Sequence, residues 1–80
     1  MSKIDKLFEK LMSGRADANF PFSELCSLLS RLGYQSRQRG SHLVFKLGES
    51  FINVQNEKGK AKPYQVRQAR EQLQMHNIKP

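Results

Sequence analysis

At residue 34 the spacing of the apolar side chains changes from a helical period to an extended one. Residues 25–32 carry four leucines that recur three or four positions apart, as on one face of an amphipathic helix. Residues 42–46 and 51–55 instead have large apolar side chains at every second position, first Leu43 and Phe45 and then Ile52 and Val54, as strands do when one face of a sheet is buried. The sequence therefore predicts an α+β fold in which helices cover one face of an antiparallel sheet and the other face is open to solvent.

The remaining elements follow from the same two periods and from the turn residues. The expected elements are helices over residues 3–12, 23–32 and 63–76, and strands over residues 34–39, 42–46 and 51–55. Ser23 is the expected N-cap of the second helix, and Pro63 suits the first position of the third. Gly40 and Ser41 form a two-residue hairpin turn, whereas residues 57–60 are expected to be a loop. The predicted order is α-α-β-β-β-α, with a three-stranded sheet in a single domain over residues 1–80.

The composition is that of a small basic domain. Eighty residues bury only a modest core, and 14 Lys and Arg against 7 Asp and Glu give a formal net charge of +7. Nearly all of the excess lies in residues 34–80, which carry nine basic and three acidic side chains. One cysteine excludes an internal disulfide and a cysteine-ligated metal site, and no apolar run is long enough to cross a membrane. We therefore expect a cytoplasmic protein without metal or cofactor, whose concentrated positive charge favours nucleic acid as partner.

His42 is a candidate proton acceptor on the predicted open face of the sheet. Alternation along the strand places it on the same side as Lys46, and the first strand would add Arg37 and Arg39. Cationic neighbours favour the neutral imidazole, attract phosphate and stabilise negative charge on a reacting phosphoryl group. This pattern suits metal-free cleavage of RNA, although a lone histidine on a strand is usually a solvated residue.

The turn beside His42 belongs to the same candidate site. Gly40 and Ser41 allow a nucleic-acid backbone to approach closely, and the serine hydroxyl can bond a phosphate or the imidazole. A register slip of one residue in the polar first strand would bring Ser36 and Gln38 to this face in place of the two arginines.

A second candidate site precedes the last helix. Lys60 and Lys62 flank the expected helix N-terminus at Pro63, where free backbone N–H groups favour phosphate, and Arg67 and Arg70 extend the basic surface along the outer helix face. Such a run of charge can also be no more than a solvated surface.

Three segments of the sequence together resemble the HicA family of bacterial toxins. The segment Gly40-Ser41-His42-Leu43-Val44-Phe45 follows a helix that ends Leu32-Gly33-Tyr34, and residues 52–55 and 59–68 resemble the longer members of that family. The resemblance covers about residues 20–75. The helix over residues 3–12 is a departure, since the shortest members lack it; it could pack on the back of the sheet, mediate self-association or enlarge a partner interface.

The resemblance implies a fold similar to a double-stranded-RNA-binding domain and an mRNA interferase activity. His42 occupies the position of the family's single catalytic histidine, which implies metal-independent endonucleolytic cleavage of mRNA. The implied protein partner is a HicB-type antitoxin that covers the site. The alternative is a basic RNA-binding module without catalysis; a DNA-binding repressor fits least well, because no helix-turn-helix precedes the last helix.

Overall fold

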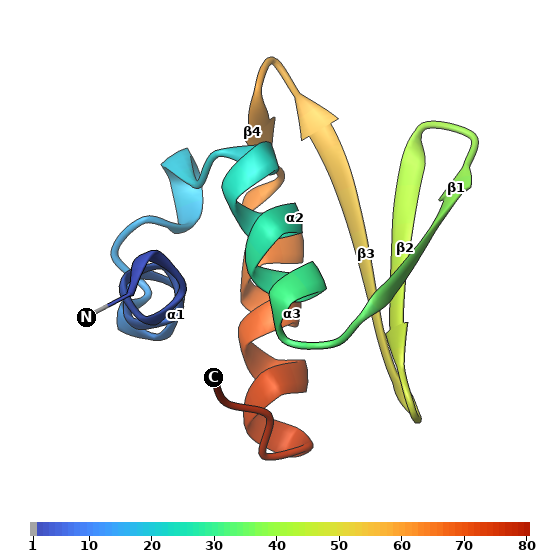
Figure 1. The fold of residues 1–80 in the computed structure, drawn as a ribbon. Helices are drawn as coiled ribbons and strands as arrows, with labels where there is room; N and C mark the ends of the chain where they lie inside the picture. Colours follow the sequence, from blue (N-terminus) through green and yellow to red (C-terminus); the bar gives the residue numbers. More distant parts are fainter. Residues whose placement is uncertain (1) are drawn as a thin grey trace.

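Residues 2–80 are described by the computed structural model, and they form four helical segments and four strands. These are α1 (Lys3–Ser13), the short 3-10 helix η1 (Asp17–Asn19), α2 (Phe22–Arg31), β1 (Gln35–Arg39), β2 (His42–Leu47), β3 (Ser50–Glu57), β4 (Lys60–Ala61) and α3 (Pro63–Met75). The α+β class and the six expected elements are confirmed, each within a few residues of its expected bounds. The elements form three layers: the sheet, then α2 with α3, then α1 on the side away from the sheet (Figure 1).

The sheet is antiparallel with the order β1-β2-β3-β4, so the expectation of three strands is wrong by one. The fourth strand follows from a tight turn, because Lys58 and Gly59 both have positive φ, 54° and 88°. Two such residues are the pattern of a type I′ turn, which reverses the chain into a hairpin at once. The strand β4 pairs with the end of β3 and also bridges to Pro21, so that it joins the sheet to the start of α2.

The helix α2 begins one residue earlier than the sequence predicts. Pro21, and not Ser23, is its N-cap, and the first helical bond runs from the Leu25 N–H to the Pro21 carbonyl at 3.1 Å. The Phe22 N–H donates instead to the Gly59 carbonyl at 3.0 Å. The β3–β4 hairpin thus satisfies one of the backbone N–H groups that have no partner within the first turn of the helix.

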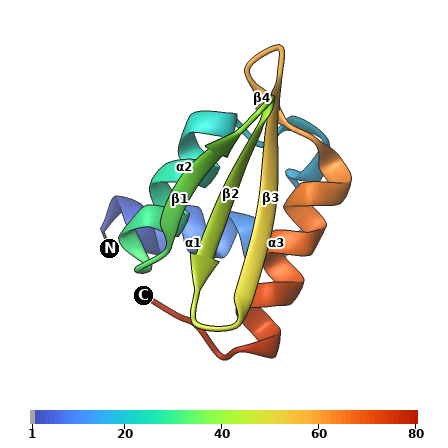
Figure 2. The ribbon, with the colours of Figure 1, turned by 90° about the vertical axis from the view of Figure 1, so that its right-hand side faces the viewer.

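The hydrophobic core lies between the sheet and the middle layer of helices. The inward positions of β2 and β3 are buried at Phe45, Ile52 and Val54, as their alternation predicts. The helix α3 contributes the predicted apolar positions, and α2 contributes three leucines. The buried helical side chains of this layer are Leu25, Leu28, Leu29, Val66, Ala69 and Leu73. The opposite face of β1, β2 and β3 is covered by no helix of residues 2–80 (Figure 2).

The N-terminal helix α1 is an integral part of the core. Leu7 and Leu11 are buried against the middle layer, and Leu11 is fully so. Packing of α1 directly on the back of the sheet, one of the three roles considered for this helix, is not what the structure shows, because α2 and α3 lie between α1 and the sheet. The helix contacts α2 and α3 and does not touch the open face of the sheet (Figure 1).

Arg70 of α3 bonds to α1 and η1 and is not part of an exposed basic surface. Its guanidinium forms two hydrogen bonds with the Asp17 carboxylate, at 2.8 and 2.9 Å, and a third with the Leu11 carbonyl at 3.0 Å. The prediction that Arg70 extends an RNA-binding helix face is therefore wrong. The reason is tertiary: η1 and the end of α1 pack against this side of α3, a contact that helical spacing alone does not reveal.

Candidate functional site

Where β1, β2 and β3 pair with one another, the open face of the sheet presents nine side chains in three rows of three. Because residues directly opposite one another on antiparallel strands point to the same face, the strand register defines each row. Across β1, β2 and β3 the rows are Gln35–Lys46–Phe51, Arg37–Val44–Asn53 and Arg39–His42–Gln55. This register is the one that places Arg37 and Arg39, and not Ser36 and Gln38, on the face of His42.

His42 is the central residue of the row nearest the β1–β2 turn. It is half-buried, with Arg39 opposite it on β1 and Gln55 opposite it on β3. The turn itself is set by Gly40, whose φ of 60° at the first turn position suits a type II′ hairpin. A side chain at this position would meet nothing within 4 Å, so the backbone conformation and not lack of space accounts for the glycine. The tight turn fixes the pairing of Arg39 with His42.

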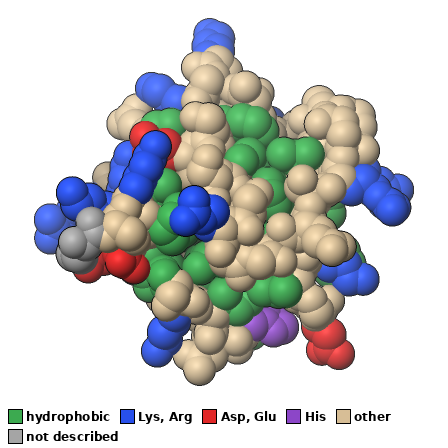
Figure 3. Space-filling view, in the orientation of Figure 1, with side chains coloured by type: hydrophobic (Ala, Val, Ile, Leu, Met, Phe, Trp, Pro, Cys, Tyr) green, Lys and Arg blue, Asp and Glu red, His purple; other side chains and the backbone are tan. Residues whose placement is uncertain are grey.

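Three basic side chains share this face with His42, and none of the nine side chains is acidic. Arg37, Arg39 and Lys46 are exposed, and none of them forms an ion pair within residues 2–80. The ammonium of Lys46 lies 5.2 Å from the centre of the Phe51 ring. In the orientation of Figure 1, basic side chains project from the right-hand edge of the molecule, where the sheet lies (Figure 3). The face therefore offers unneutralised positive charge to a polyanion.

A buried glutamine on α3 holds the strand that faces His42. The Gln65 Oε1 accepts a hydrogen bond from the Gln55 backbone N–H at 2.7 Å, and its Nε2 donates to the Gln55 Oε1 at 3.3 Å. The Gln55 Nε2 in turn lies 3.4 Å from the Ser41 Oγ in the turn. Sequence reasoning did not single out Gln65, although it lies four residues before the buried Ala69 and so shares its helix face.

The second predicted cluster lies at the same end of the sheet as His42. The β1–β2 turn and the β3–β4 turn both lie at this end (Figure 2). Lys60 on β4 donates to the Asn19 Oδ1 at 2.8 Å, and Lys62, the N-cap of α3, lies 3.8 Å from the Glu57 carboxylate. Arg67 is exposed on α3. Lys62 is thus partly neutralised, in contrast to the basic residues of the open face.

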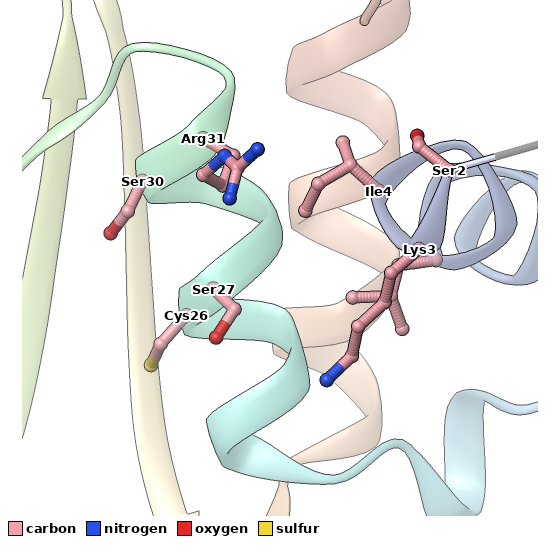
Figure 4. A pocket seen from close by; sticks show the side chains of 8 residues that line it. Ser2, Lys3, Ile4, Cys26, Ser27, Ser30 and Arg31 are labelled. Carbon is pink, nitrogen blue, oxygen red and sulfur yellow. The ribbon is translucent and has the colours of Figure 1, made fainter.

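A separate hollow of about 450 Å³ lies between α1 and α2, where Lys3 and Ile4 face Ser27 and Arg31 (Figure 4). Its one ionisable sulfur is Cys26. Burial raises the pKa of the Cys26 thiol to about 11, so the thiolate needed for nucleophilic chemistry is not populated near neutral pH.

The chain is therefore a small basic α+β domain with an open, cationic sheet face built around one histidine. Residues 22–75, about two thirds of the chain, match the family model described as HicA toxin of bacterial toxin-antitoxin. The chain belongs to this family, as its sequence indicates, and is a HicA toxin of a toxin–antitoxin system. The matched segment contains α2, the four strands and α3, and it leaves out α1 and η1.

No curated protein and no solved structure matches the chain. The expected likeness to a double-stranded-RNA-binding domain therefore stays a prediction. Among residues 2–80, no helix combines the length and apolar character that crossing a bilayer requires.

Proposed function

We propose that this HicA toxin is a metal-independent endoribonuclease that cleaves mRNA in the cytoplasm and uses His42 as its catalytic residue. The observation that carries the proposal is the position of His42, which is central in its row among nine side chains of the open face that include three basic residues and no acidic one. A phosphodiester bound there would meet a proton acceptor and positive charge together. Membership in the HicA family supports the same activity.

The proposed reaction is an attack of the RNA on its own backbone. Neutral His42 takes the proton of a 2′-hydroxyl, and the resulting 2′ oxygen forms a bond with the adjacent phosphorus. The bond from phosphorus to the 5′ oxygen breaks, and that oxygen is protonated as it leaves. The products are a 2′,3′-cyclic phosphate and a 5′-hydroxyl end. Proton transfer by a positioned side chain contributes roughly 10² to 10⁴-fold, which suits a slow, one-histidine enzyme.

The remaining site residues bind and orient the RNA in this proposal. Arg37, Arg39 and Lys46 hold the phosphates, and the charge nearest His42 stabilises the oxygens of the transition state. The turn of Gly40 and Ser41 offers backbone and hydroxyl groups to the strand. The more distant residues that contact the RNA backbone are Lys60, Lys62 and Arg67.

The proposed protein partner is a HicB-type antitoxin that covers the open face. The charge of that face favours an acidic partner surface, which would compete with RNA. The variant Arg39→Glu should weaken the complex at least tenfold, whereas Arg15→Glu, an exposed residue between α1 and η1, should leave it unchanged. Equal weakening by both variants would place the antitoxin elsewhere.

The chemistry of the product ends tests the proposal against a non-catalytic RNA-binding module, which the same basic face could also support. Purified protein is incubated with a long mRNA in EDTA, and the new ends are mapped. Cyclic-phosphate and 5′-hydroxyl ends are expected. Saturable, salt-sensitive binding without any new ends would exclude the nuclease and leave the binding module.

A further inference from the structure

Two hollows on the open face meet at the ring of Phe51. The larger, of about 510 Å³, lies toward the start of β1 and includes Lys46. The other, of about 400 Å³, lies beside His42; its lining is Arg39, His42, Val44, Phe51 and Asn53. Lys46, whose ammonium lies 5.2 Å from the centre of the Phe51 ring, lines the first hollow and is not among the residues that line the second. The ring thus forms a wall of the hollow next to the proposed catalytic residue.

Phe51 is not part of the hydrophobic core, so core packing does not explain an aromatic ring at this position. Its residue is 51% exposed, whereas its neighbour Ile52 on the core face is fully buried. Exposed aromatic rings beside arginine and lysine are the means by which proteins bind unstacked bases, since every base has a face on which it can stack. Val44, in the centre of the nine residues, gives the hollow an apolar floor next to this ring.

Asn53 supplies the polar group that the ring lacks. It is exposed on β3, and it is the diagonal neighbour of His42 across the β2–β3 ladder, about 7–8 Å away between Cα atoms. Its carboxamide has both a donor and an acceptor, which match the paired donor and acceptor on the edge of a base. The hollow therefore combines a stacking surface, an apolar floor and an edge-reading group within reach of the histidine.

We propose that the hollow beside His42 is a subsite for one unstacked nucleobase of single-stranded RNA, with Phe51 as the stacking platform and Asn53 as the specificity-determining residue. This inference rests on the proposed function for its place next to the cleaved bond. The subsite selects single-stranded RNA, because in an A-form duplex the bases are stacked and their edges are accessible chiefly in the minor groove. The nucleotide whose base enters the hollow is thus the one that fixes where cleavage occurs.

A scan with abasic nucleotides tests the subsite by binding, separately from cleavage. The parent is the His42→Ala protein, which leaves the RNA intact, and the ligand is a single-stranded oligonucleotide in which one base at a time is removed. Base stacking on an aromatic side chain is worth about 5- to 150-fold in affinity. We expect one abasic position to weaken binding to the parent by a factor in this range, and to have little effect once Phe51→Ala is added.

Matched variants separate stacking from general loss of apolar surface. Phe51→Tyr should retain the effect of the missing base, and Phe51→Leu should lose it. Met75→Ala, which removes an apolar side chain that is 71% exposed at the end of α3, should bind as the parent does. Asn53→Ala should change which base is preferred at the sensitive position.

The outcomes distinguish this inference from the proposed function. If Phe51→Ala binds as tightly as the parent and shows the same response to every abasic position, the subsite is wrong even where the wild-type protein cleaves RNA. If the wild-type protein cleaves nothing but the Phe51-dependent abasic effect is present, the subsite stands and the nuclease is wrong.

Discussion

The Gln65 side chain on α3 bonds the backbone of Gln55, the residue directly opposite His42 on β3. Gln65 is only 3% exposed, and its carboxamide forms both of its hydrogen bonds with Gln55. At this position β3 has β2 on one edge and has not yet reached β4 on the other. A buried side chain thus replaces the missing strand and fixes the part of the sheet that carries the candidate site.

Gln65→Leu should therefore lower both stability and activity. The leucine leaves the partly buried Gln55 N–H without its side-chain partner, which costs about 1–3 kcal/mol in the free energy of unfolding. Urea denaturation measures this loss, and Gln74→Leu, an exposed glutamine on the same helix, is the control. If Gln65→Leu and Gln74→Leu unfold at the same urea concentration, the hydrogen bonds of Gln65 do not stabilise the fold.

The Arg70–Asp17 pair predicts a stability that depends on acid pH. The hydrogen bonds from Arg70 hold the pKa of the Asp17 carboxyl below its ordinary value of 3.8, against a smaller opposing effect of burial. A group whose pKa is lowered by folding stabilises the fold above its unfolded value, and this contribution is lost as the pH falls through the folded value. Both side chains are 17% exposed, and charged hydrogen bonds of this kind contribute about 2 kcal/mol.

Comparison of wild type with Asp17→Asn measures that contribution. The variant should be less stable at about pH 7, and the difference should shrink as the pH falls below about 4 and through the lowered pKa of the folded state, where the wild-type carboxyl becomes neutral too. Glu9→Gln, at an exposed position of α1, is the control for loss of one negative charge. A difference that stays constant from pH 7 down to about pH 2 would contradict the assignment.

Leu11 predicts that α1 is required for stability although it lies outside the segment matched by the family model. Its side chain is 0% exposed. Leu11→Ala should cost about 2–5 kcal/mol, as expected for a buried leucine, and Ile4→Ala, at a partly buried position, should cost less. Thermal unfolding of both variants checks this order, and a larger loss for Ile4→Ala would mean that α1 is anchored by its first turn instead.

Salt dependence identifies which basic residues contact RNA phosphates. Each phosphate contact contributes about 0.7 to the slope of log affinity against log salt for a single strand. The double variant Arg37→Ala with Arg39→Ala should therefore reduce the slope by about 1.4. The pair Lys60→Ala with Lys62→Ala should reduce it less, since Lys62 already has the Glu57 carboxylate nearby. A larger reduction for the lysine pair would move the main RNA contact to the start of α3.

The sequence predicted those helices and strands in which the apolar side chains recur with one clear period. The leucine spacing of α2 and the alternation in β2 and β3 determined the helices, the strands and the core face, because burial on one side leaves a regular pattern. All five residues of β1 are exposed and polar, so alternation carries no information there. Its register comes from the two-residue turn at Gly40 and Ser41, which requires Arg39 to face His42.

The features that were not predicted depend on contacts between distant segments. The strand β4 has two residues, too few for a period, and its turn contains a lysine at positive φ. Arg70 looks like a surface residue until η1 packs beside it. Phe51 was assigned only to the start of a strand, and its exposure next to His42 became evident from the register of β2 and β3.

Metal-independent RNA cleavage by His42 is tested most directly by comparing the cleavage rate of wild type with that of His42→Ala on one mRNA in EDTA. Catalysis by His42 predicts a rate for the variant that is lower by about 10² to 10⁴-fold, with the unfolding midpoint and the RNA affinity unchanged. A His42→Ala protein that cleaves as fast as wild type would contradict it.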